Sequence, residues 1–158
     1  MFNAGNFSDS VRKSKLLLKE NPRHIICYNI LSLSLMKTGE NEEAIKILNR
    51  ALKYEPKNIH VLNNLGLAYY NLDSFDKSKL YLEECLKINP DFFDALINYG
   101  NLFLTLNNPL KALDLLNNAL KLSINNSQKQ MALMAIGNCY QQKGDFFKAE
   151  ETFQEVLK

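Results

Sequence analysis

The sequence predicts an all-α protein built from antiparallel helix pairs, and two observations carry this prediction. One pattern of small and large apolar residues recurs in three gapless copies with a period of 34 residues, and returns in a fourth copy after three extra residues. Within each copy, a residue type that tolerates a left-handed backbone follows the first apolar segment, as is typical of a helix end. A period of this length indicates a two-helix unit stacked into an array.

We expect a single domain over residues 1–158. Residues 1–24 form the second half of an incomplete repeat, because Gly5 and Phe7 match the later copies in register. The remaining copies are repeat 1 (25–58), repeat 2 (59–92), repeat 3 (93–126) and repeat 4 (130–158), the last of which is incomplete at its end.

The first helix of each copy has an apolar stripe at positions 4, 7, 8 and 11, which is helical spacing and predicts a core face. Position 8 is always small: Ser32, Gly66, Gly100 and Gly137. Position 24, on the second helix, is always large: Leu48, Leu82, Leu116 and Phe153. Small and large residues at these fixed offsets predict that the two helices of a pair pack at close range.

The turn between the two helices is predicted from position 15, which holds Gly39, Asp73, Asn107 and Gly144. These types adopt a left-handed backbone after a helix end more readily than others. Position 16 supplies candidate N-caps for the second helix in Ser74, Asn108 and Asp145, and Pro109 fits a first helical turn. Pro56 and Pro90 stop the second helices of their copies, whereas the third copy has Ile124 at that position.

These residues resemble the tetratricopeptide repeat, whose pattern has Leu-Gly at positions 7 and 8, Tyr at 11, Ala at 20, Phe at 24 and Pro at 32. The closest matches are Leu65-Gly66 with Tyr69, and Gly137 with Tyr140. The resemblance covers essentially the whole chain and implies a right-handed α-solenoid, or superhelix. It also implies that positions 2, 5, 6, 9, 12 and 13 of the first helices line a concave groove that binds a protein or peptide partner.

The predicted groove is rich in amides and apolar side chains and poor in charge. Its candidate peptide-binding residues are Asn29, Ile30, Leu33, His60, Asn63, Asn64, Leu67, Tyr70, Ile97, Asn98, Asn101, Met131, Met134 and Asn138. An amide side chain donates and accepts hydrogen bonds at once, so it suits the backbone of an extended peptide.

The resemblance implies two possible binding modes for the groove. Asn64 and Asn98 share position 6 and resemble the asparagine ladder of protein O-GlcNAc transferases, although Ile30 and Ala135 interrupt it. The alternative is that a chain with 20 Asn places some of them in any groove. The carboxylate clamp of chaperone adaptors requires cations that this groove lacks, and Asp94 would repel a carboxylate, so we do not expect that mode.

Composition argues against several classes of function. A formal charge of +2 is too small to indicate a nucleic-acid or membrane partner, and no run of residues approaches the length of a membrane span. No catalytic, metal or cofactor motif is present, so we expect neither an enzyme nor a cofactor. Cys27, Cys85 and Cys139 are widely spaced and predict buried, unpaired thiols in a cytoplasmic protein.

The sequence therefore predicts a non-catalytic scaffold or adaptor that binds a peptide segment of a partner. The alternative is that the same repeats recruit substrate for a larger enzyme, such as a protein glycosyltransferase. Phe153, Val156 and Leu157 lack a capping helix in the sequence, which leads us to expect an exposed apolar end face. Such a face is typical of a longer array or of copies that self-associate through their end helices.

Overall fold

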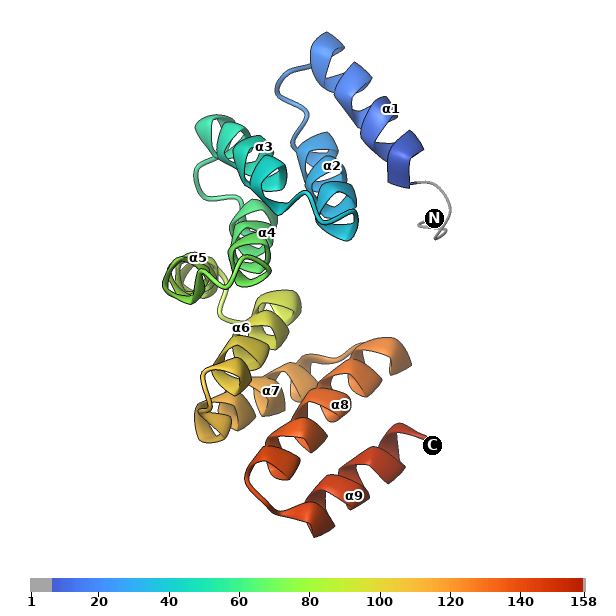
Figure 1. Ribbon diagram of the computed structural model, residues 1–158, viewed down its shortest axis with the longest axis vertical. Coiled ribbons are helices and arrows are strands. Elements are labelled where there is room, and N and C mark those ends of the chain that lie inside the picture. The colour runs from blue at the N-terminus through green and yellow to red at the C-terminus, as the bar shows by residue number, and fades with distance from the viewer. Residues whose placement is uncertain (1–6, 158) are drawn as a thin grey trace. The chain divides into compact units, whose positions relative to one another are not determined.

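The computed structural model describes residues 7–157, so the register match of Gly5 lies outside the described residues. Within that range the chain forms nine α-helices and no strand (Figure 1). They are α1 (Phe7–Glu20), α2 (Ile25–Lys37), α3 (Asn41–Tyr54), α4 (Ile59–Tyr70), α5 (Phe75–Ile88), α6 (Phe93–Thr105), α7 (Pro109–Leu122), α8 (Asn126–Gln142) and α9 (Phe146–Val156).

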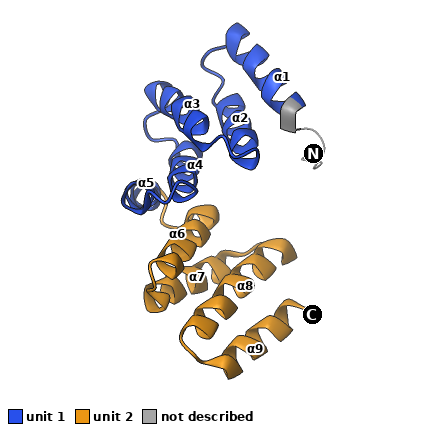
Figure 2. Cartoon of the chain, in the orientation of Figure 1, with its two compact units in different colours: residues 1–88 blue, residues 89–158 orange. Residues whose placement is uncertain are grey.

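The chain divides into two compact units, Met1–Ile88 and Asn89–Lys158 (Figure 2). In unit 1, α2 pairs with α3 and α4 pairs with α5, while α1 packs on α2 and α4 contacts both α2 and α3. In unit 2, α6 pairs with α7 and α8 pairs with α9, while α8 contacts both α6 and α7. Within each unit the first helices of successive pairs therefore touch each other.

The helix starts follow the predicted period. Helices α2, α4 and α6 begin at Ile25, Ile59 and Phe93, which are 34 residues apart. Helix α8 departs from this pattern, because it begins at Asn126 and not near Gln130. No proline follows α7, and the side chain of Asn125 accepts a hydrogen bond from the backbone N–H of Gln128. This N-cap lets the inserted residues become an extra first turn of α8.

The turns between paired helices have the predicted left-handed residue. The φ angles are 84° at Gly39, 54° at Asp73, 55° at Asn107 and 78° at Gly144. Two predicted N-caps are confirmed, because the side chains of Asn108 and Asp145 accept hydrogen bonds from the backbone three residues later. Local chemistry therefore fixes where each first helix ends and its partner begins.

The predicted core stripe is buried except at position 11 of repeats 2 and 4, where Tyr69 and Tyr140 are half-buried. Its most enclosed members are Tyr28, Leu31, Leu35, Leu62, Leu65, Leu96 and Leu133. A second buried stripe runs along positions 3 and 10 of the first helices and consists mainly of small residues: Cys27, Ser34, Val61, Ala68, Ala95, Leu102, Ala132 and Cys139. Each first helix thus buries two faces, since it packs on its own partner and on neighbouring helices.

Positions 8 and 24 meet where the two helices pack in repeats 2, 3 and 4. A methyl group added at Gly66 would lie 2.6 Å from Cγ of Leu82, and one added at Gly100 would lie 2.6 Å from Cγ of Leu116. A methyl group at Gly137 would collide with the ring of Phe153. The predicted close packing of small against large residues is therefore confirmed.

Gly100→Ala should lower the free energy of unfolding by about 1–3 kcal/mol, because overpacking against Leu116 outweighs the roughly 1 kcal/mol gained in helix propensity. Urea unfolding monitored by circular dichroism measures this change in the free energy of unfolding. The same change made in a Leu116→Ala background should cost much less, because the vacated space accepts the new methyl group. Equal costs in both backgrounds would contradict the contact.

Ser78→Ala should leave stability unchanged or raise it by up to about 1 kcal/mol, because the wild-type hydroxyl is fully buried and has no hydrogen-bond partner. The matched control is Ser34→Ala, which removes an equally buried hydroxyl that donates to the carbonyl of Ile30 at 2.8 Å. Chemical denaturation should rank Ser78→Ala as the more stable variant. The reverse order would show that the Ser78 hydroxyl is satisfied.

Candidate functional site

The unit 1 face is the surface formed by positions 2, 5, 6, 9, 12 and 13 of α2 and α4, which contact each other. Asn63 and Asn64 are buried on it, with exposed fractions of 5% and 6%. The other predicted site residues on α2 and α4 are half-buried or exposed: Asn29, Ile30, Leu33, His60, Leu67 and Tyr70. Ile26 is 65% exposed beside them. The face is therefore an accessible apolar surface with an amide cluster at its floor.

The amides of the unit 1 face form a connected chain. Nδ2 of Asn64 donates to Oδ1 of Asn29 at 3.2 Å, and Nδ2 of Asn63 lies 3.5 Å from Oδ1 of Asn64. The first bond joins α4 to α2, so it links two successive repeats. Part of the hydrogen-bonding capacity of Asn64 is therefore used within the protein. Asn29 is the more accessible amide of the pair.

Aromatic contacts flank the end of this face. Tyr70 is half-buried, and its ring centroid lies 6.0 Å from that of Phe75, at the start of α5. The neighbouring Tyr69 ring stacks on Tyr81 with a centroid distance of 5.5 Å and an interplanar angle of 3°. Burial is the main cause of a raised pKa at Tyr81, and the nearby Tyr69 and Glu84 raise it further. The Tyr81 hydroxyl therefore stays neutral. The contact with Phe75 holds the Tyr70 ring at the edge of the face.

The unit 2 face is formed by the same positions of α6 and α8. Ile97 is buried at 5%, Asn98 and Asn101 are half-buried, and Asn138 is exposed. Met131 and Met134 are 49% and 46% exposed. At one end of the face, Nε2 of Gln142 donates to the carbonyl of Leu104 at 3.1 Å and so links α8 to α6. Flexible thioether side chains here can adapt to an apolar partner.

The two asparagines of the predicted ladder lie in different units, Asn64 in unit 1 and Asn98 in unit 2. Asn64 also donates a hydrogen bond to Asn29, which lies one position earlier in the previous repeat. The two faces carry little charge, with Lys37 on one and Asp94 on the other. Any ligand they hold is therefore recognised by shape, apolar contact and amide hydrogen bonds.

The three cysteines are buried and form no disulfide, as the sequence predicted. Burial raises the pKa of the Cys139 thiol to about 11, although Lys143 opposes the effect, and burial also raises the pKa of Cys27. These two thiols stay protonated near neutral pH and are poor nucleophiles. Among residues 7–157, no group of three or more His, Cys, Asp or Glu side chains is placed to hold a metal ion.

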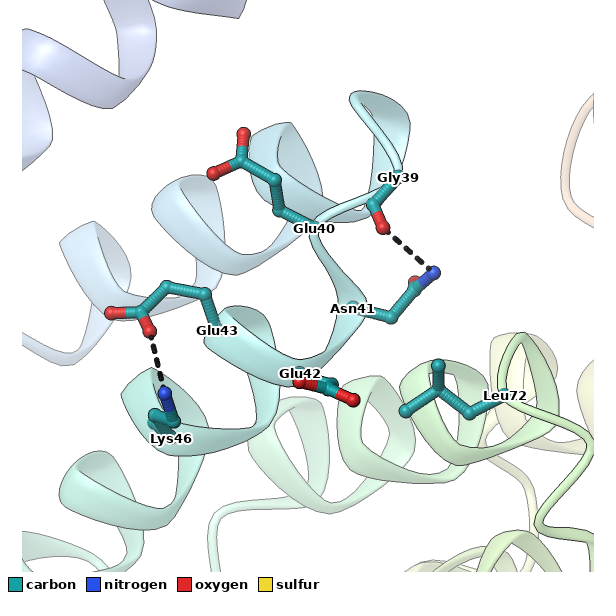
Figure 3. A pocket seen from close by; sticks show the side chains of 7 residues that line it. All are labelled: Gly39, Glu40, Asn41, Glu42, Glu43, Lys46 and Leu72. Atoms are coloured by element: carbon teal, nitrogen blue, oxygen red, sulfur yellow. Dashed lines mark hydrogen bonds and ion pairs between the residues drawn. The ribbon is translucent and has the colours of Figure 1, made fainter.

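Among the pockets outside the two faces is one where α3 begins beside Leu72 (Figure 3). It is lined by Gly39, Glu40, Asn41, Glu42, Glu43, Lys46 and Leu72. Its acidic residues have local structural roles, because Glu42 and Glu43 occupy the first turn of α3 and Glu43 pairs with Lys46 at 3.3 Å. We assign no ligand to this pocket.

His24 has a structural role at the start of α2 that the sequence did not lead us to expect. Nδ1 of His24 accepts a hydrogen bond from the backbone N–H of Cys27 at 3.4 Å, which makes His24 the N-cap of α2. Asn58 caps α4 in the same way, through a hydrogen bond of 3.1 Å. Both residues stand directly before a first helix, and this position in the sequence could have indicated a cap.

No helix within residues 7–157 is both long enough and apolar enough to cross a bilayer.

Comparison with known proteins identifies the repeat. Models of the tetratricopeptide repeat match residues 59–92 and 100–158, and a further TPR repeat model matches residues 33–73. No curated protein sequence matches the chain.

Solved structures resemble almost the whole chain. TTC0263, a thermophilic TPR protein in Thermus thermophilus, has 19% identity and a TM-score of 0.86, with coverage of 97% of this chain and 82% of that one. MamA AMB-1 has 25% identity and a TM-score of 0.72, with coverage of 98% and 89%. A chain of the APC/C hetero-tetramer Cut9-Hcn1 has 17% identity and a TM-score of 0.89, with coverage of 96% and 30%. These likenesses confirm the predicted all-α solenoid class.

The Asn29–Asn64 hydrogen bond should contribute a coupling of about 0.5–1.5 kcal/mol to the free energy of unfolding, because Asn64 is buried. A double-mutant cycle with Asn29→Ala and Asn64→Ala measures it. The matched control is the exposed amide pair of Asn41 and Asn71, which are joined at 3.0 Å and compete with water. That control should couple by less than about 0.5 kcal/mol. Equal coupling in both cycles would contradict the prediction that burial strengthens the Asn29–Asn64 hydrogen bond.

Proposed function

Because the chain belongs to the tetratricopeptide repeat family, we propose that it is a non-catalytic protein-interaction scaffold. Its ligand is an extended peptide segment of a partner protein, bound against the unit 1 face, the unit 2 face or both. The observation that carries this proposal is the combination of accessible apolar side chains and half-buried amides on the first helices of both units.

Free-energy magnitudes favour apolar contact as the main source of affinity. One amide hydrogen bond contributes about 0.5–1.5 kcal/mol net, whereas a micromolar complex requires about 8.2 kcal/mol. Covering a large apolar side chain contributes about 1.5–3 kcal/mol, and Ile26, Met131 and Met134 are each about half exposed or more. The partner segment should therefore carry several apolar side chains, while the amides align its backbone.

The low charge of both faces limits the kind of partner segment that they can bind. Lys37 and Asp94 are single charges at separate places, so neither face offers the paired cations that hold a carboxylate or phosphate. We therefore propose a partner segment that is uncharged over the length it binds. The three buried cysteines form no disulfide, which supports a cytoplasmic setting for this interaction.

Loss of apolar surface from the faces should weaken peptide binding. A peptide selected on the wild-type protein from a library of short, uncharged peptides serves as the probe. If it binds unit 2, Met131→Ala with Met134→Ala should weaken binding on the order of tenfold or more. If it binds unit 1, Ile26→Ala with Tyr70→Ala should do the same. Isothermal titration calorimetry gives the affinities.

The matched control is Leu80→Ala with Leu110→Ala, because these side chains are 59% and 63% exposed on the second helices α5 and α7. This double variant loses comparable apolar surface outside both faces and should bind with unchanged affinity. Failure to select any peptide, or equal weakening in all three double variants, would contradict the proposed binding faces.

A further inference from the structure

The last described helix, α9, exposes an apolar patch followed by an acidic pair. The side chains of Phe146 and Phe147 are 69% and 72% exposed. One turn later, Glu150 and Glu151 are also exposed. Residues four apart are neighbours on a helix surface, so these four side chains cover two successive turns of one side of α9. Within the described part of the chain, both phenylalanine rings remain largely exposed to solvent.

On an earlier second helix, α7, the counterpart of Glu150 is covered, whereas Leu110 and Asp114, the counterparts of Phe147 and Glu151, are exposed. In α7, Leu113 occupies the repeat position of Glu150 and is only 8% exposed, because α8 packs against α7. The side of α9 that bears Phe146 and Glu150 therefore corresponds to the side of α7 that packs against the next repeat in the same unit. At the end of this side, Leu157 is 88% exposed. The position is built for helix packing, but no helix covers it among the described residues 7–157.

The first helix, α1, exposes the complementary arrangement in reverse order. Arg12 and Lys13 are exposed, and one turn later Leu16 and Leu17 are 50% and 48% exposed. These side chains lie away from Ser14 and Leu18, which are buried against the rest of unit 1. Over its whole length α1 carries four cations and two anions, whereas α9 carries one cation and three anions.

The spacing of the two arrangements matches when the helices run antiparallel. In α9 an aromatic pair precedes an acidic pair by four residues, and in α1 a basic pair precedes a leucine pair by four residues. Antiparallel packing therefore places Phe146 and Phe147 against Leu17 and Leu16. It also brings the two carboxylates of α9 to the two cations of α1.

We propose that α9 of one copy packs antiparallel against α1 of a second copy. The leucine and phenylalanine side chains form the centre of this contact, and Glu150 and Glu151 pair with Lys13 and Arg12. Existing contacts compete only weakly, because the Arg12–Asp9 pair is exposed and 3.5 Å long and the Gln154–Glu150 bond is exposed and 3.4 Å long. The interface joins unlike surfaces, so association continues head to tail along a series of copies.

This association is independent of the peptide-binding faces. It uses α1 and α9, whereas the faces use α2, α4, α6 and α8. Charge pairing at the rim of such a contact strengthens at low salt and is screened as ionic strength rises.

Sedimentation velocity on the full chain tests the proposal. The sedimentation coefficient should rise between about 1 µM and about 1 mM protein, the range expected of a small interface, and the rise should shrink at high salt. Phe146→Ser with Phe147→Ser should abolish the rise. Glu150→Lys with Glu151→Lys should weaken association at least about tenfold, because two attractions become repulsions.

Arg12→Glu with Lys13→Glu should weaken association equally. An equimolar mixture of the two charge-reversed proteins should associate again, because each supplies the helix that complements the other. The matched control is Glu83→Lys with Glu84→Lys on α5, which makes the same charge change elsewhere and should leave association intact. Circular dichroism verifies that each variant is folded.

Three results would overturn the proposal. The first is a sedimentation coefficient that stays constant over the whole concentration range. The second is a mixture of charge-reversed proteins that stays monomeric while the wild type associates. The third is a salt-dependent change in sedimentation without concentration dependence, which would mean that α1 and α9 meet within one chain.

Discussion

The close approach of two helices at one small residue is the contact on which the repeats depend. In repeats 2, 3 and 4, the second helix can lie this near its partner only because position 8 of the first helix is glycine. The large side chain at position 24 then fills the space and is shielded from water, as in Leu48, Leu82 and Leu116. Because the packing is that tight, the relative placement of the two helices within each pair is set by a few atoms. The surface offered by the first helices follows from this placement.

Much of this arrangement could be predicted from the sequence because it rests on local chemistry. The left-handed turn residues, two of the second-helix caps and the core stripe depend on neighbours within one repeat. The second buried stripe was missed because Ala68, Ala95 and Ala132 have no large apolar side chain to signal burial. Its burial arises from contacts with neighbouring helices, which the periodicity of a single helix does not report.

The candidate site was predicted less completely, for a related reason. The residue types on the faces were identified from register, but the burial of Asn63, Asn64 and Ile97 depends on how closely successive first helices approach. That distance is a property of the stacked repeats. The same effect turned Asn64 toward Asn29, so a side chain assigned to a ligand also connects two repeats. The early start of α8 likewise came from a cap, Asn125, beyond the expected start of its repeat.

The three buried thiols give the protein an internal set of reporters. Cys27, Cys85 and Cys139 lie in α2, α5 and α8, so each belongs to a different helix pair. Each thiol is shielded from an alkylating reagent while the helices that pack around it stay in place. In a linear array, each pair is stabilised only by its immediate neighbours, and opening is local before it is global. The alkylation rate of each thiol consequently measures how often its own part of the chain unfolds, and the three rates together map stability along the protein without any added label.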